Sequence, residues 1–177
     1  SDDVVWTGDH DYTGVTSLNN GSRLALGAGG NTGSIVGDVR FVGAPGTLEI
    51  NRANDYLYDG VISGAGNLIK NGAGNYILSA DHSMTGNASV NAGGMVVNGA
   101  MNGVAFTVND GGLLGGSGSL GDTTVLSGGT LAAGNSIGAL TINGNLTFNS
   151  GSLLELEVDP TSTSSDLITV TGQANLA

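Results

Sequence analysis

Residues 127–148 read SGGTLAAGNSIGALTINGNLTF, and this stretch decides the fold of the chain. It contains two short runs that alternate apolar and polar residues, Ala139–Ile142 and Asn145–Phe148, joined by Asn143-Gly144. Alternation with a period of two indicates β-strands, and Asn and Gly tolerate the positive φ angles that tight turns require. No part of the stretch has helical periodicity, so we expect strands connected by sharp turns.

The same plan of strand, Asn/Gly turn and strand recurs along the whole chain. The last glycine of the turn recurs at steps of 17 to 28 residues, at Gly21, Gly46, Gly74, Gly94, Gly112, Gly129 and Gly151. A persistent period near ~20 residues with no helical segment is typical of stacked coils. A sandwich would show cleaner hairpins of equal strands. We therefore predict an all-β parallel β-helix (β-solenoid) of about seven to eight coils, each burying its apolar side against its neighbours.

Composition supports a single β-rich domain with an aliphatic core. The chain has 177 residues, of which 39% are hydrophobic but only 5% aromatic, so Val, Ile, Leu and Ala must fill the interior. Its 33 glycines come with only two prolines and no collagen period. The absence of cysteine excludes disulfides and thiolate metal sites.

Charge narrows the range of partners. Fifteen acidic residues face four basic ones, giving a net charge of −11. Nucleic acids and anionic membrane surfaces are poor partners for such a chain, because phosphate binding needs clustered Lys and Arg. No apolar run approaches the ~20 residues of a membrane-spanning helix. The chain has no signal peptide at its start and stops within the repeat pattern, so we expect it to be a fragment of a longer protein.

Two long motifs resemble the passenger domains of bacterial autotransporters. Residues 58–99 are similar to the passenger-associated repeat, with Gly60, Ile62, Ser63, Gly64, Gly66, Leu68, Lys70, Gly72, Gly74, Ile77, Leu78 and Ser79 in its first half and Met84, Thr85, Gly86, Val90, Asn91, Gly93, Gly94 and Val97 in its second. Residues 111–176 are similar to the segment that usually follows, with Ala133 replacing its customary proline. Residues 12–57 resemble a more divergent copy, so the resemblance covers about nine tenths of the chain.

The resemblance implies a right-handed parallel β-helix displayed outside a Gram-negative cell. A C-terminal translocator barrel in the parent chain would attach such a passenger to the outer membrane. We treat residues 1–177 as one β-helical passenger segment, with divergent coils at 1–57, the passenger-associated repeat at 58–110 and regular coils at 111–177. The family includes adhesins, self-associating proteins and a minority of proteases and esterases, so the repeat identifies the scaffold and not the activity.

Two glycine-rich motifs match enzyme signatures but lack their context. Gly134-Asn135-Ser136-Ile137-Gly138 fits the nucleophile elbow, which needs a strand-to-helix turn, a histidine and an acid. A strand pattern follows it here, and the only histidines are His10 and His82. Gly116–Gly121 fits G-x-G-x-x-G without the βαβ unit of a dinucleotide site. We interpret the first motif as a coil corner and the second as a chance match in a glycine-rich chain, and we predict no cofactor.

Asp9-His10-Asp11, close to Trp6, is the one cluster that could hold a divalent cation or line a sugar site. A one-residue spacing places Asp9 and Asp11 on the same face of a strand. The simpler interpretation is that these residues form a solvated terminus. The calcium-binding repeat G-G-x-G-x-D is also absent from the sequence. We predict no metal site and leave the role of this cluster open.

Other charged and aromatic residues are compatible with a hydrolytic site or with an exposed contact surface. Pairs of carboxylates can perform general acid-base hydrolysis at the right separation, and the candidates are Asp38 with Arg40, Glu49 with Arg52, and Asp55 with Asp59. Glu155 and Glu157 alternate with Leu154, Leu156 and Val158, so we place them on the outward face of the last strands. Tyrosines favour interfaces, so Tyr12, Tyr56, Tyr58 and Tyr76 are either exposed contact patches or core residues.

We predict a non-enzymatic surface passenger that acts as an adhesin or adhesive stalk. Its partners would be a host surface or extracellular matrix component, a glycan, or sister passenger chains. One alternative is a scaffold that supports folding and secretion, with its longest regular strands and a protease-resistant core from about Gly111 onward. Another is a carbohydrate-active or ester-hydrolysing β-helix. A local function would be expected in the irregular first 60 residues.

Overall fold

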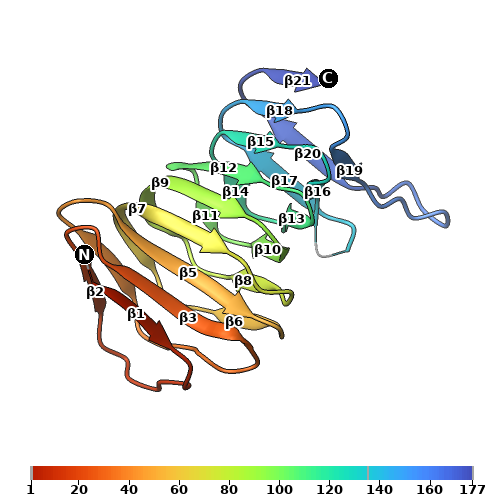
Figure 1. The fold of residues 1–177 in the computed structure, drawn as a ribbon. Helices are drawn as coiled ribbons and strands as arrows, with labels where there is room; N and C mark the ends of the chain where they lie inside the picture. The colour runs from red at the N-terminus through yellow and green to blue at the C-terminus, as the bar shows by residue number, and fades with distance from the viewer. Residues whose placement is uncertain (1, 135, 177) are drawn as a thin grey trace.

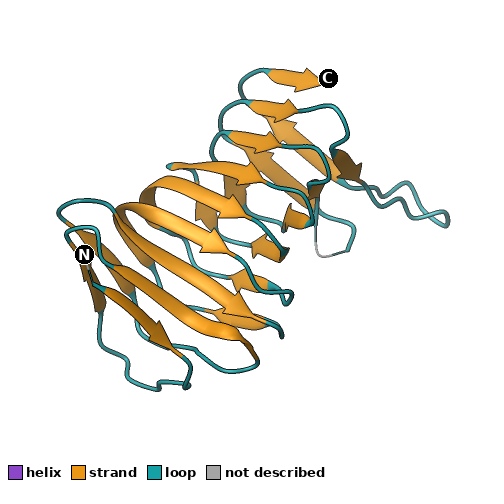
Figure 2. Ribbon diagram, viewed as in Figure 1, coloured by secondary structure: helices purple, strands orange, loops and turns teal. Residues whose placement is uncertain are grey.

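The chain forms a β-solenoid of about eight turns, described here by a computed structural model that covers residues 2–134 and 136–176 (Figures 1 and 2). All strand-to-strand pairings between named strands are parallel within these residues. This confirms the predicted all-β solenoid. The described residues contain no helix that is long and apolar enough to cross a membrane.

Three parallel sheets make the walls. The long sheet has the order β1 (Asp3–Trp6), β3 (Arg23–Gly30), β5 (Gly46–Arg52), β7 (Ile62–Lys70), β9 (Ser83–Val90), β12 (Val104–Val108), β15 (Thr123–Val125), β18 (Leu146–Phe148) and β21 (Ala174–Leu176), with β2 (Thr16–Asn19) and β4 (Val39–Val42) beside it. The six-stranded sheet comprises β6 (Tyr56–Tyr58), β8 (Tyr76–Leu78), β10 (Gly93–Val97), β13 (Gly112–Gly115), β16 (Thr130–Ala132) and β19 (Leu153–Glu155). The four-stranded sheet comprises β11 (Ala100–Met101), β14 (Ser119–Leu120), β17 (Ala139–Ile142) and β20 (Leu167–Val170).

The stretch at 127–148 forms strands as predicted, but its two runs lie in different walls. β17 pairs with β14 and β20 in the four-stranded sheet, whereas β18 pairs with β15 and β21 in the long sheet. Asn143-Gly144 is therefore a corner of the coil and not a hairpin turn. Gly144 has a φ of 154° at this corner. Asn143 donates its amide to Asn102 of another coil at 3.0 Å.

Residues at equivalent positions of successive coils form columns that run along the solenoid. One inward column in the long sheet contains Leu24, Leu48 and Leu68 in register, and each is at most 2% exposed. A second contains Val90, Val108 and Val125, none of them exposed. Full burial of such a side chain contributes about 1.5–3 kcal/mol. A coil gains this stabilisation only when another coil covers its apolar side chains, so the stacking of coils is the source of stability.

The regularly spaced turn glycines also form a column, with one correction to the predicted positions. Following the strand register, Gly74, Gly93, Gly112 and Gly129 occupy equivalent positions at the start of successive strands of the six-stranded sheet. The repeat therefore uses Gly93 rather than Gly94. Gly93 has a φ of 61°, and a Cβ there would lie 2.6 Å from the carbonyl oxygens of Gly72 and Ala73 in the adjoining coil. Only glycine fits such a corner without displacing the neighbouring coil.

The longest strands lie in the first half of the chain, which contradicts the expectation that the C-terminal strands would be longest. β7 has nine residues and β3 and β9 have eight, whereas β13 to β21 have two to four. After β19 the chain leaves the wall in an excursion that is closed by an antiparallel bridge between Val158 and Ser165 (Figure 1). Continuous in-register pairing from β5 to β9 explains why the middle coils are the most regular.

Candidate contact surfaces

A row of hydrogen-bonded polar side chains runs across successive coils beside the long sheet. Arg23 forms an ion pair with Glu49, which also accepts a 2.9 Å hydrogen bond from Asn71. Asn71 accepts from the amide of Asn91 at 2.8 Å, and Asn91 accepts from Asn109 at 2.7 Å. Asn71 and Asn91 each accept a hydrogen bond from the asparagine of the following coil. This row of side chains, the polar ladder, therefore fixes the register of the coils. Glu49 is only 7% exposed, which removes it as a free catalytic acid.

Asp9 of the predicted cation cluster is engaged in holding a corner. Its carboxylate accepts hydrogen bonds from the backbone nitrogen of Gly33 at 3.0 Å and from the Ser34 hydroxyl at 2.7 Å. Arg52 lies 3.2 Å away as an ion-pair partner. The Ser34 hydroxyl, followed by Arg52, lowers the pKa of Asp9. Both partners predicted for the Glu49–Arg52 pair therefore have other partners, Arg23 and Asp9 respectively.

The other members of that cluster do not converge on a metal. Asp11 is exposed, and the ring of His10 packs 4.7 Å from the ring of Trp6, which also lies 6.1 Å from Tyr12. Among residues 2–134 and 136–176, no group of three or more His, Cys, Asp or Glu side chains could hold a metal ion. The cluster contributes an aromatic group at the N-terminal end of the solenoid.

The remaining carboxylates of the middle coils mostly cap backbone nitrogens of a neighbouring coil. Oδ1 of Asp38 accepts from Val61 at 2.8 Å, and Oδ1 of Asp55 accepts from Asn75 at 2.8 Å. The same contact recurs from Asp81 to Ala100, from Asp122 to Asn145 and from Asp166 to Gly138. Asp59 instead binds the hydroxyl of Ser79, and Arg40 is exposed. The Asp38–Arg40 and Asp55–Asp59 pairs thus do not form a shared acid-base site, and much of the acidic composition is structural.

The two enzyme-like motifs are corners. Ser136 lies exposed in the connection between β16 and β17; Asn135 lies outside the described residues. Gly138 of the same motif donates its backbone nitrogen to Asp166 at 2.8 Å. Gly116–Gly121 contains β14, and Gly116 has a φ of 116°. Neither motif is followed by a helix in the part of the chain that the structure describes, so both lack the element that their enzyme signatures require.

Three of the four tyrosines are core residues, so the alternative of an exposed tyrosine patch is wrong for them. Tyr56, Tyr58 and Tyr76 are at most 8% exposed, and their ring centroids lie 5.4–6.0 Å apart. Tyr58 donates to the carbonyl of Gly37 at 2.9 Å. Burial raises the pKa of Tyr56 to about 12 and raises that of Tyr76 well above its ordinary value. Tyr12 is half-buried and hydrogen-bonds Thr16.

Two buried basic side chains also have structural partners. Lys70 is 1% exposed, and its ammonium group donates to the carbonyls of Gly72 and Ala92, the latter at 3.0 Å. Burial lowers its pKa to about 8. His82 is 7% exposed, and its Nδ1 accepts the backbone N–H of Ile62 at 3.1 Å, while burial lowers its pKa to about 4.

The outward face of the six-stranded sheet carries an apolar stripe. Leu57 of β6, Ile77 of β8 and Val96 of β10 occupy one column in register. Leu57 is 57% exposed and the other two are partly exposed. Aliphatic side chains in one row on a rigid sheet form a surface that suits protein contacts. The amino-acid pattern alone did not predict this stripe. The alternation Tyr56-Leu57-Tyr58 was the available signal, since burial of the two tyrosines requires Leu57 to point outward.

A second surface, the hydroxyl row, lies on the outward face of the long sheet. Ser89, Thr107, Thr124 and Thr147 stand in register on β9, β12, β15 and β18. In-register residues of adjacent strands are about 4.8 Å apart, so the row presents evenly spaced hydroxyl groups. It carries no charge, although the chain as a whole has a net charge of −11.

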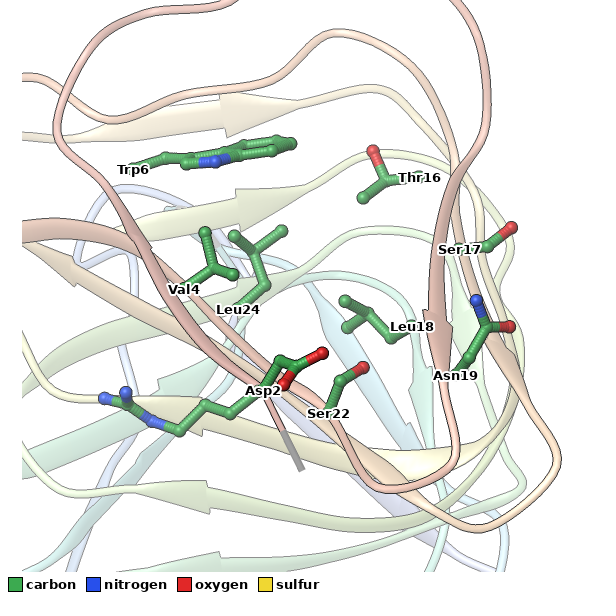
Figure 3. Close-up of a pocket in the computed structure, with 10 residues that line it drawn as sticks. Asp2, Val4, Trp6, Thr16, Ser17, Leu18, Asn19, Ser22 and Leu24 are labelled. Atoms are coloured by element: carbon green, nitrogen blue, oxygen red, sulfur yellow. The ribbon is translucent and has the colours of Figure 1, made fainter.

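The surface of the described residues has at least two hollows. The larger, about 360 Å³, lies at the N-terminal end between β1 and β2, where Val4, Trp6, Leu18 and Leu24 face a common space and Thr16 lies at its rim (Figure 3). The smaller, about 200 Å³, is a shallow depression lined by Asn102, Asp122 and Asn143 among other residues. The first has an apolar side where Val4, Trp6 and Leu24 continue the core columns, and polar residues such as Thr16, Ser17 and Asn19 line the rest. It is an uncovered end of the core rather than a catalytic cleft.

Comparison with known proteins identifies one relative. In an alignment of 128 residues that covers 62% of the chain, the sequence is 40% identical to the adhesin BmaC autotransporter of Brucella suis biovar 1. The chain is homologous to an autotransporter adhesin. The match covers only 4% of that relative's length. No family model matches the chain, and no solved structure matches it.

The homology and the solenoid together confirm the resemblance to autotransporter passengers. The described side chains that looked catalytic have structural partners or stand alone. The outward faces are therefore the parts of the molecule that remain free to meet a partner.

Proposed function

We propose that this chain is part of the surface-exposed passenger of an autotransporter and that it serves adhesion. The observation that carries the proposal is the 40% identity to a segment of an autotransporter adhesin, in a chain folded as a solenoid. A rigid rod with flat walls holds contact residues at fixed spacing, which suits attachment to a large surface. The cell surface of a Gram-negative bacterium, with attachment to the outer membrane, is the proposed location.

We further propose that the apolar stripe of Leu57, Ile77 and Val96 is the contact surface, and that a host surface or matrix protein is the partner. Polypeptide partners bury apolar groups at the centre of their interfaces. The stripe combines such groups with a rigid backbone, so little conformational entropy is lost on binding. The polar neighbours Asn75 and Ser79 supply a rim.

The test measures retention of purified chain on immobilised matrix proteins, host cells, a glycan array and sister bacteria. We expect binding to a protein surface, weakened ~10-fold by the triple variant Leu57→Thr, Ile77→Thr, Val96→Thr, which keeps β-propensity while removing apolar area. The matched control replaces Thr107, Thr124 and Thr147 of the hydroxyl row with serine and should bind as the unmodified chain. Absence of binding to every surface would contradict adhesion by this segment.

Two other functions predict different outcomes. A role as a folding and secretion scaffold is favoured by the polar ladder, which couples many coils. Deletion of this segment should then reduce display of the parent protein without removing binding to a ligand. A carbohydrate-active or ester-hydrolysing β-helix should turn over a substrate in a broad screen of polysaccharides and esters. Activity in that screen would replace the adhesive proposal.

A further inference from the structure

A small hollow interrupts the outward face of the long sheet in the middle of the solenoid. It has a volume of about 200 Å³, and its lining residues come from β9, from β12 and its preceding turn, and from the corners beside β15 and β17. β7 pairs with β9 on one side, and β18 pairs with β15 on the other. Paired coils therefore flank the hollow in both directions.

The hollow exists because one outward column of the long sheet lacks a polar side chain at a single step. Asn67 and Asn87 stand in register with the exposed Ala105 of β12. The register of β12, β15 and β18, extended by one residue, places Asp122 and Asn145 next in the same column. Ala105 supplies only a methyl group between these longer side chains, so the column has a gap at its position.

Two glycines keep the floor of this gap open. Gly86 has a φ of 116°, and a Cβ there would lie 2.2 Å from the carbonyl oxygen of Gly66. A Cβ at Gly103 would lie 2.9 Å from the carbonyl oxygen of Met84. Neither position accepts a side chain without displacing the neighbouring coil. The backbone therefore fixes the hollow, and no side-chain rotation of these residues can close it.

The rim of the hollow carries polar groups that remain available to a ligand. Asn143 donates to Oδ1 of Asn102 at 3.0 Å, and Oδ1 of Asp122 accepts the backbone N–H of Asn145 at 2.7 Å. Within the residues that the structure describes, these contacts leave the amide nitrogen of Asn102, the amide oxygen of Asn143 and Oδ2 of Asp122 without a hydrogen bond. The rim thus offers a neutral donor, a neutral acceptor and one charged acceptor.

We propose that this hollow binds one ring of an uncharged saccharide. Sugar hydroxyl groups both donate and accept hydrogen bonds, so they match the mixed donors and acceptors of the rim. Thr107 and Thr124 of the hydroxyl row lie two residues along the same outward face from Ala105 and Asp122, where they can contact an adjoining ring. The site goes beyond the proposed protein contact, because the apolar stripe lies on the six-stranded sheet.

Charge and size exclude other classes of ligand. Asp122 is the only charged residue among those that line the hollow, and the chain has a net charge of −11, so acidic sugars and phosphates are repelled. A metal ion is far smaller than 200 Å³, and the described residues hold no group of three or more His, Cys, Asp or Glu that could ligate one. Apolar ligands would leave the polar rim without partners.

An amide NMR titration of the purified chain tests the proposal. The probes are the methyl glycosides of glucose, galactose, mannose and N-acetylglucosamine, with N-acetylneuraminic acid as the charged comparison. We expect at least one neutral glycoside to shift the amide resonances of Gly103, Ala105 and Asp122. The expected Kd is on the order of 1 mM, because a single ring makes few contacts in a shallow site.

Two variants of the site and two controls give the decisive comparison. Ala105→Asn restores the polar column and should weaken binding by ~10-fold or more, because the added carboxamide occupies the space of the ring. Asp122→Asn retains the acceptor for the Asn145 N–H and should weaken binding by ~5-fold through loss of the charged acceptor. Ala28→Asn, at an exposed alanine of β3 in the same sheet, should bind as the unmodified chain does.

The second control separates this site from the apolar stripe. The triple variant Leu57→Thr, Ile77→Thr, Val96→Thr should keep its affinity for the sugar even though it loses the protein contact. The proposal is overturned if no neutral glycoside shifts these amides, or if N-acetylneuraminic acid binds as tightly as the neutral sugars. Unchanged affinity in an Ala105→Asn variant whose NMR spectrum shows the native fold would also overturn it.

Discussion

At the scale of single residues, His82 couples the stability of the solenoid to pH. Its Nδ1 accepts the Ile62 N–H, so the fold requires the neutral imidazole, and burial lowers its folded pKa to about 4 from an ordinary value of 6.5. The unfolded chain therefore binds a proton at a higher pH than the folded chain does. The stabilisation is complete above about pH 6.5 and is lost as the pH falls toward 4.

Urea unfolding between pH 7.5 and 5 measures this dependence. We expect the unmodified chain to lose stability across that window, and His82→Gln to lose much less, because glutamine does not titrate. His10→Gln serves as the control and should retain the pH dependence of the unmodified chain. Equal slopes for the His82 variant and the unmodified chain would contradict the assignment.

A substitution of Asn91 tests whether the polar ladder stabilises the fold. It donates to Asn71 at 2.8 Å and accepts from Asn109 at 2.7 Å. Asn91→Asp removes the donor and places a carboxylate against the Asn71 oxygen, so we expect a loss of about 1–2 kcal/mol in the free energy of unfolding. The matched control is Asn87→Asp on the same strand. The single amide contact of Asn87 spans 3.4 Å, so this variant should change stability by less than about 0.5 kcal/mol.

At the scale of elements, the coil corners depend on glycines that bring two backbones together. A Cβ at Gly72 would lie 1.9 Å from the carbonyl oxygen of Arg52 in the neighbouring coil. Gly72→Ala must push the coils apart, and we expect a loss of about 2 kcal/mol or more. Gly30→Ala on β3 is the control, because a Cβ there meets nothing within 4 Å. Thermal unfolding of both variants measures the difference, and equal melting temperatures would contradict this role of the corner.

The elements also show what sequence could and could not predict. Alternation located β17 with the bounds observed and β18 to within one residue, because period-two patterning depends only on which side chains face the core. Asn143-Gly144 shows the limit, since the same dipeptide suits a hairpin and a coil corner, and only the pairing of β17 and β18 decides. Tyr56 and Leu57 show a second limit: alternation says they face opposite ways but not which one faces inward.

At the scale of the whole molecule, coverage by neighbouring coils determines where the solenoid is most stable. Fully buried side chains extend from Leu26 to Ile142, whereas Leu153, Leu167 and Leu176 are more than half exposed. Amide exchange should therefore be slowest in β5, β7, β9 and β12 and fastest in β19 to β21.

Limited proteolysis measures the same gradient and should cleave first in the excursion between Val158 and Ser165. The expected product is an N-terminal fragment that retains the middle coils. This differs from the sequence-based prediction of a resistant core from about Gly111 onward, which rested on long C-terminal strands that the structure does not contain. A resistant fragment that begins near Gly111 would support the earlier prediction and contradict the structural one.

Function was less predictable than fold for a physical reason. The acidic residues that looked available for chemistry, such as Asp38 and Asp55, bind backbone nitrogens of the next coil, and sequence spacing does not reveal partners about 20 residues away. The apolar stripe, by contrast, exists only after stacking brings Leu57, Ile77 and Val96 into one column. A contact surface assembled from separate coils leaves no local sequence signature.

Each coil of the solenoid adds one parallel step, and pulsed electron paramagnetic resonance measures that step directly. The chain has no cysteine, so spin labels can be placed by Ile69→Cys with Thr147→Cys, and by Ile69→Cys with Asn175→Cys. These outward positions belong to one column, and the two pairs are four and five steps apart. We therefore expect narrow distance distributions near ~19 Å and ~24 Å, a difference of about one 4.8 Å step. Broad distributions, or a second distance no longer than the first, would contradict the stacked solenoid.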